Sequence, residues 1–236
     1  MRRTRFFELK TIAAAAGIGI AAFAGSPAMA QVAPTASEAA AYTGLHAAAQ
    51  QGDLAKIEQL ASSKADLNGR DSNGRTPLHV ASFAKQRDAI RALDKAGANI
   101  NLLDKDRYDG LTIASVADDE ETLRLLLASG ASAKLVTSRY DGTALIAAAH
   151  LGHDGVVKQL IAAGAPLDHV NNLHWTAAIE AVVLGNGGAR HQETLRALIK
   201  AGANLQLTDR QGNTPLQLAI ARGYAEMAKM LSVPAR

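Results

Sequence analysis

The chain has 236 residues, with 25 basic and 22 acidic side chains and no cysteine. The lack of cysteine excludes disulfides, a thiol nucleophile and thiolate metal sites. Arg2, Arg3, Arg5 and Lys10 supply four of the basic residues, and Glu8 one of the acidic residues. Beyond this start the sequence has 21 residues of each sign and is formally neutral, which argues against nucleic acid as a partner.

Residues 1–30 have the three parts of an export signal. The basic residues precede an apolar run over residues 11–25, and small residues (Ala-Met-Ala) follow at 28–30. A signal peptidase reads this order, so we expect cleavage after Ala30 and a mature chain without a membrane anchor. A retained anchor is the alternative, but 15 residues rich in Ala and Gly are short for a membrane span. We expect a periplasmic protein, with release from the cell as the alternative. The Arg2-Arg3 pair leaves twin-arginine export open, but Arg5 stands where that signal has an aromatic residue, so the general secretory route is favoured.

Six similar units follow the export signal. Each contains a polar residue that recurs at spacings of 33, 33, 34, 33 and 38 residues, and alanine always follows it five residues later. A period of this size indicates a solenoid, in which each unit packs only against its neighbours. The recurring polar residues are Thr43, Thr76, Asp109, Thr143, Thr176 and Thr214.

The unit boundaries follow from this alignment. Residues 31–37, with small and polar side chains and a proline, are predicted to be a flexible lead-in. The repeat domain then spans residues 38–232, with units at 38–70, 71–103, 104–137, 138–170, 171–208 and 209–232.

Each unit is predicted to be a helix, a turn, a second helix and an extended finger. In Thr76-Pro77-Leu78-His79 the hydroxyl caps a helix, proline occupies the first helical position and leucine turns inward. The second helix ends near a glycine, where the backbone has to adopt a left-handed conformation. These glycines are Gly97, Gly130, Gly164 and Gly202.

The repeat resembles the ankyrin repeat, whose Thr-Pro-Leu-His-x-Ala signature is complete at residues 76–81. Gly97-Ala98-Asn99 and the segment at 209–216 match the same pattern. The resemblance implies an all-α solenoid of about six helix-turn-helix units with β-hairpin fingers and a concave groove. It also implies a monomer that binds another protein, without catalysis or a cofactor. Residues 174–188 look like a unit of exported bacterial ankyrin proteins, some of which are linked with envelope stress protection, including support of a catalase.

Aromatic residues outside the export signal gather at one place in the units. Tyr42, Arg75, Tyr108 and Trp175 each stand immediately before the recurring polar residue, and Tyr140 lies on the finger of the fourth unit. Tyr, Trp and Arg are enriched at binding hot spots. We predict that the fingers and the adjoining first helices bind a partner; packing of the rings against the next finger is the alternative. The predicted partner-binding residues are Tyr42, Arg75, Phe83, Tyr108, Tyr140, His150 and Trp175.

The fifth unit has five extra residues within 185–192, between its two helices. In the same unit Glu180 occupies a place that is apolar in the other units. An unpaired charge near a core is costly, so we predict that Arg190 or His191 from the inserted loop pairs with Glu180. An ion pair that pins the loop is favoured over a specialised docking site, which is the alternative.

No pattern in the sequence predicts catalysis or a metal site. His46 and His79 occupy the signature place, where the imidazole is expected to bond to neighbouring backbone, and the other histidines lack the spacing of metal ligands. No Gly-rich phosphate loop or Gly-x-Ser-x-Gly elbow occurs. We therefore expect a protein that binds another protein and is not an enzyme. The alternatives are a secreted factor that binds a foreign host protein and a protein that binds a metal or small ligand.

Overall fold

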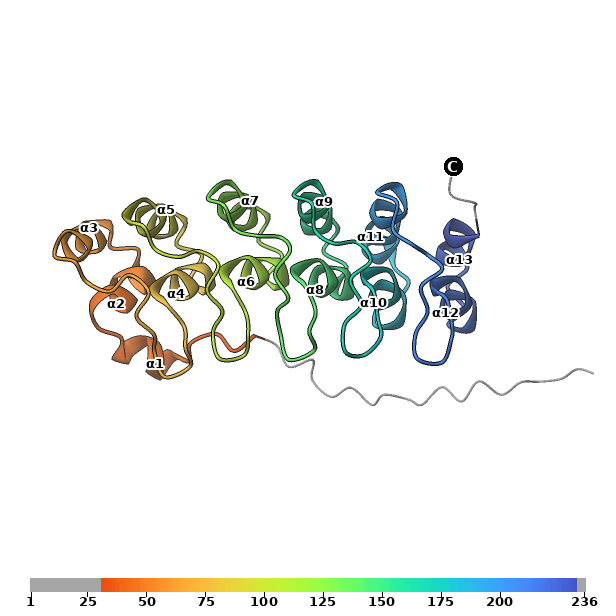
Figure 1. The fold of residues 1–236 in the computed structure, drawn as a ribbon, viewed down its shortest axis with the longest axis horizontal. Helices are drawn as coiled ribbons and strands as arrows, with labels where there is room; N and C mark the ends of the chain where they lie inside the picture. The colour runs from red at the N-terminus through yellow and green to blue at the C-terminus, as the bar shows by residue number, and fades with distance from the viewer. Residues whose placement is uncertain (1–30, 233–236) are drawn as a thin grey trace, which may run out of the picture. The chain divides into compact units, whose positions relative to one another are not determined.

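The computed structural model describes residues 31–232, which contain thirteen α-helices. The predicted export signal, residues 1–30, lies outside the described residues. After the short helix α1 (Ala36–Ala41), the helices alternate between two rows (Figure 1). The inner row holds α2 (Gly44–Gln51), α4 (Pro77–Phe83), α6 (Gly110–Val116), α8 (Ala144–Leu151), α10 (Ala177–Val183) and α12 (Pro215–Ala221). The outer row holds α3 (Leu54–Ser62), α5 (Arg87–Ala96), α7 (Glu120–Ala128), α9 (Asp154–Ala162), α11 (Ala189–Lys200) and α13 (Ala225–Leu231).

The inner helices begin at the polar residues that recur in the sequence. The side chain at this place accepts a hydrogen bond from the backbone N–H three residues later in five units, which confirms the predicted caps. The prediction is wrong for Thr43, whose side chain makes no capping bond. The glycines after the outer helices are also confirmed, since Gly97 and Gly130 have φ of 98° and 89°.

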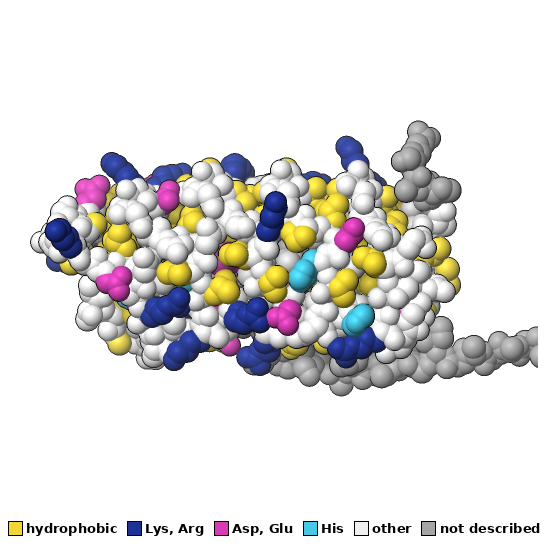
Figure 2. Space-filling model, in the orientation of Figure 1, with side chains coloured by type: hydrophobic (Ala, Val, Ile, Leu, Met, Phe, Trp, Pro, Cys, Tyr) yellow, Lys and Arg dark blue, Asp and Glu magenta, His cyan; other side chains and the backbone are white. Residues whose placement is uncertain are grey.

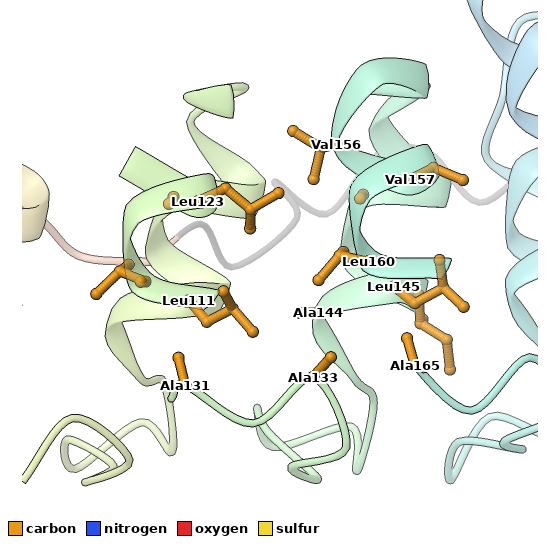
Figure 3. Close-up of a cluster of buried hydrophobic side chains, with 14 of the residues drawn as sticks. Leu111, Leu123, Ala131, Ala133, Ala144, Leu145, Val156, Val157, Leu160 and Ala165 are labelled. Carbon is orange, nitrogen blue, oxygen red and sulfur yellow. The ribbon is translucent and has the colours of Figure 1, made fainter. Parts of the chain in front are cut away.

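The core lies between neighbouring helix pairs. The recurring alanine of every inner helix is at most 3% exposed, and its small side chain lets adjacent helices approach closely. Figure 3 shows Leu111 and Leu123 of the third unit pointing toward the fourth unit, whose Leu145 and Leu160 complete the cluster. Because each unit covers the apolar face of the next, the units stabilise one another in series.

The fingers are tight turns that carry no β-strand within residues 31–232. We use the word finger for residues 71–75, 104–108, 137–142, 171–175 and 209–213, each closed by a hydrogen bond from the first backbone N–H to a carbonyl near the last residue. A single isolated bridge, Thr137 with Gly142, is the nearest approach to a ladder. The prediction of β-hairpins is therefore not confirmed, because each turn closes with one hydrogen bond across it and paired strands need more.

Two segments differ from the sequence-based prediction. The lead-in was placed at 31–37, yet α1 starts at Ala36, where Thr35 and Glu38 form a reciprocal capping box. The inserted segment of the fifth unit is only partly a loop, because residues 189–192 extend α11 at its start. None of the helices in the described part of the chain has the length and apolar character that a bilayer crossing requires.

Candidate functional site

The fingers are joined laterally by charged side chains. Arg107 pairs with Asp141 of the next finger at 2.6 Å, and Arg139 of that finger reaches back to Asp106 at 3.3 Å. The backbone joins the fingers as well, since Lys105 N–H donates to Asn73 and Asn172 N–H donates to Tyr140. Lysine and arginine side chains gather along the lower margin of the molecule, over the finger loops (Figure 2). The charged residues of the fingers thus stiffen this edge.

Arg75 does not lie on the exposed edge where the sequence placed it. Its side chain is only 1% exposed and pairs with Asp71 at 2.6 Å and Glu38 at 2.9 Å. It also donates to the carbonyl of Val32 at 3.3 Å. The expectation of an exposed arginine is wrong, because α1 and the segment before it cover this position. Arg75 instead joins α1 to the finger at 71–75.

Tyr42 belongs to the same network. Its hydroxyl donates to Asp71 Oδ2 at 2.7 Å, and its half-buried ring packs against the core. Burial, together with the hydrogen bond to Asp71, raises the pKa of the Tyr42 hydroxyl. Tyr42 and Arg75 therefore hold the start of the repeat domain together.

The other predicted residues remain accessible to different degrees. Tyr108, Trp175, Phe83 and His150 are half-buried, and Tyr140 is 38% exposed. Their role in binding stays a prediction.

The structure adds an apolar row, of which the sequence predicted only Phe83. It runs across the last turns of four successive inner helices and consists of partly or fully exposed side chains, namely Phe83, Val116, Leu151, Val183 and Leu184. The row could have been found by aligning the places seven and eight residues after each capping residue, where hydrophobic residues recur in units two to five. It borders His150, so this face combines apolar and polar contacts.

His46 and His79 bond to backbone, as predicted. His79 Nδ1 accepts from Thr76 N–H at 3.1 Å, so its proton lies on Nε2, which donates to the Tyr108 carbonyl at 2.9 Å. His46 Nε2 lies 2.9 Å from the Arg75 carbonyl. Each ring thus ties an inner helix to the next finger. Across residues 31–232, no group of three or more histidine, aspartate or glutamate side chains is arranged to hold a metal ion.

Glu180 is buried, as its apolar place in the repeat predicts, and is 4% exposed. Its Oε1 accepts a hydrogen bond from Asn171 Nδ2 at 2.9 Å, and its Oε2 lies 3.6 Å from His150 Nδ1. Burial raises the pKa of the Glu180 carboxyl to about 7, although the bond from Asn171 acts in the opposite direction. The sequence predicts neither Asn171 nor His150 as a partner of Glu180.

The predicted pairing of Glu180 with the inserted segment is wrong. Arg190 pairs with Asp118 at 2.8 Å and with Asp154 at 3.3 Å, which ties the fifth unit to the third and fourth. His191 is buried, with Nε2 2.9 Å from the His150 carbonyl. The extra helical turn of α11 directs both side chains toward the preceding units and away from Glu180.

Comparisons with known proteins agree with this architecture. Residues 18–104 and 111–206 match the family model for three copies of the ankyrin repeat, and residues 187–231 match a second model for many copies. The chain belongs to the ankyrin repeat family. It is 37% identical over 185 residues to the putative ankyrin repeat protein YahD of Escherichia coli strain K12, an alignment that covers 78% of this chain and 92% of YahD.

Solved ankyrin repeat structures extend the likeness. A domain from Acinetobacter baumannii AYE is 44% identical, with a TM-score of 0.75, over 79% of this chain and 95% of that domain. A chain of the complex between the predatory endopeptidase Bd0816 from Bdellovibrio bacteriovorus and the immunity protein Bd3460 is 28% identical, with a TM-score of 0.68. It matches over 81% of this chain and 97% of that chain. The ankyrin repeat fold suits this protein to protein–protein interaction.

Proposed function

We propose that this ankyrin repeat protein is a non-enzymatic scaffold that binds one partner protein through its fingers and the ends of its inner helices. The observation that supports this most is the apolar row, which leaves Leu151 and Leu184 38% and 42% exposed on successive inner helices. Exposed apolar side chains aligned over several units, together with the exposed Tyr140 of the finger at 137–142, supply area that a protein interface buries. The complex of Bd0816 with Bd3460 includes a chain of this fold, which also supports a partner of protein nature.

We further propose that the partner is met after export. The sequence of residues 1–30 supports delivery to the periplasm, where a binding scaffold could support a stress-defence enzyme such as a catalase. Release from the cell and binding of a foreign host protein is the second candidate. Both share the binding surface and differ in where the partner is found.

Crosslinking in living cells tests the scaffold proposal. We expect the tagged full chain to capture one dominant protein, and the double variant Tyr140→Ala/Leu184→Ala to capture it at least about tenfold less well, because truncated hot-spot residues each cost more than about 1 kcal/mol. The identity of the captured protein, from mass spectrometry, separates an envelope protein from a host protein.

The matched control is Leu54→Ala, which removes a side chain of similar exposure (39%) from the outer helix α3. It should capture the partner normally. Equal capture by the double variant and the wild type would contradict the proposed surface. Thermal unfolding should be nearly unchanged in all three proteins, since none of these side chains is buried.

A further inference from the structure

Among the carboxylates of residues 31–232, Glu180 alone has a buried oxygen that accepts no hydrogen bond. Oε1 is satisfied by Asn171, but the 3.6 Å between Oε2 and His150 Nδ1 is too long for a hydrogen bond. An ionised oxygen buried without a donor is far more costly than a protonated carboxyl at the same place. Ionisation of Glu180 therefore favours any movement that brings a donor to Oε2.

Several titratable groups surround this position. The helices packed against α10 are α8, which carries His150, α11, which carries His191, and α12, which has no titratable side chain. His153, before α9, lies with Nδ1 2.9 Å from the Ser115 carbonyl. The finger at 171–175 adds Asn171 and the exposed His174. The charged side chains of α11 do not pair with Glu180. Arg190 pairs with Asp118 and Asp154, and Glu193 pairs with Arg196. Lys200 lies in the last turn of the helix.

Asn171 connects Glu180 to the finger at 171–175. While its Nδ2 donates to Glu180, its Oδ1 accepts from the backbone N–H groups of Leu173 and Trp175 at 3.0 and 2.9 Å. Its own N–H donates to the Trp175 carbonyl at 3.0 Å. A displacement of the Glu180 carboxylate is thus transmitted through one amide side chain to the backbone of Trp175.

We propose that Glu180 is a proton-controlled element of the binding surface, whose ionisation shifts Asn171 and the finger that carries Trp175, so that partner binding at units four and five depends on pH. This regulation rests on the proposed function, because it concerns the same surface. Burial places the titration of Glu180 near neutrality, with a pKa of about 7. Burial, with the nearby His191 and His153, lowers the pKa of His150, so near neutral pH the imidazole carries no positive charge to offset the charge of the carboxylate.

Trp175 is the single tryptophan of the chain, so its fluorescence reports the finger directly. For the full chain titrated from pH 5 to 9, we expect the emission to change with a midpoint near 7. Glu180→Gln should abolish the transition, since the amide keeps an oxygen for Asn171 and carries no titrating proton. Asn171→Asp should move the midpoint to higher pH, because a second carboxylate beside Glu180 disfavours its ionisation.

His174 is the matched control, because it neighbours Trp175 and is itself titratable. His174→Asn retains a residue type that tolerates the local φ of 68°, and it should leave the transition in place. A transition that persists in Glu180→Gln, or that vanishes in His174→Asn, would overturn the proposal.

A separate experiment tests whether the ionisation of Glu180 changes partner binding. Capture of the crosslinked partner at pH 6 and pH 8 should differ for the wild type and be equal for Glu180→Gln. Capture independent of pH in the wild type overturns the regulatory role. The fluorescence experiment needs no partner, so its result is independent of whether the scaffold function itself fails.

Discussion

Asn171 and Glu180 of the fifth unit each depart from the residue type found at their place in other units, and the hydrogen bond between them accounts for both departures. In three other fingers the residue equivalent to Asn171 is an aspartate, namely Asp71, Asp104 or Asp209. Each aspartate accepts hydrogen bonds from the backbone N–H groups two and four residues later. Asn171 Oδ1 makes the same two bonds, and its amide group remains free to donate to Glu180. An aspartate here would face a second carboxylate, so the amide permits a buried glutamate at an apolar place.

The raised pKa of Glu180 makes the stability of the fold depend on pH. Between the ordinary value of 4.5 and about 7, the folded chain holds a proton that the unfolded chain has lost, so the free energy of unfolding falls as pH rises through this window. We expect Glu180→Gln to remove this slope. Between pH 4 and pH 8 the free energy of unfolding of the variant should therefore rise, relative to that of the wild type, by on the order of 3 kcal/mol. Urea unfolding at several pH values measures it.

Glu193→Gln is the control for this measurement, because Glu193 is exposed and pairs only with Arg196 within the same helix. Its stability difference from the wild type should stay nearly constant with pH. Parallel curves for Glu180→Gln and the wild type would show that the carboxyl ionises freely in the fold.

At the scale of the element, the inserted segment acts as an extra turn of α11 that rests on the preceding unit. The His191 ring lies close to Gly152 and Gly185, where an added Cβ would come within 2.8 and 2.6 Å of it. Glycine at these two places therefore makes room for the ring. Arg190 pairs with Asp118 two units away, and the arginine side chain is 53% exposed.

The two side chains of this turn should differ in their contribution to stability. We expect Arg190→Ala to cost less than about 1 kcal/mol, because exposed ion pairs are screened by water. His191→Ala should cost about 2–3 kcal/mol, because it opens a cavity and removes the contact with the His150 carbonyl. Chemical denaturation followed by circular dichroism distinguishes them. Equal losses would mean that the exposed ion pair contributes as much to stability as the buried ring.

At the scale of the whole molecule, stability comes from stacking of neighbours. Every inner helix packs against the next inner helix, and contacts beyond adjacent units are few, Arg190 with Asp118 being one. Such an array behaves as a series of units joined by interfaces, and its last unit shields the apolar face of the unit before it. Here α12 and α13 shield α10 and α11.

Removal of residues 209–236 tests this arrangement. We expect the shortened chain to stay helical, with a lower denaturation midpoint and self-association, because the faces of α10 and α11 become exposed. Circular dichroism and light scattering provide the measurements. A monomer with an unchanged midpoint would show that the final unit contributes no interface energy.

The sequence by itself determined the number of repeats, the pairs of helices, most of the caps and the left-handed glycines. These features depend on interactions within a few residues, which a repeated pattern displays six times over. It also predicted correctly that Glu180 occupies a buried place and that His46 and His79 bond to backbone.

Only the tertiary structure decided which side chains meet. Arg75 is covered by α1, Glu180 faces His150 and Asn171 instead of Arg190 or His191, and the fingers close as turns without strands. These outcomes depend on residues brought together from different units and on the exact path of α1 and α11. A repeat pattern shows which places are equivalent, but the length and direction of each side chain in the stack decide its partner.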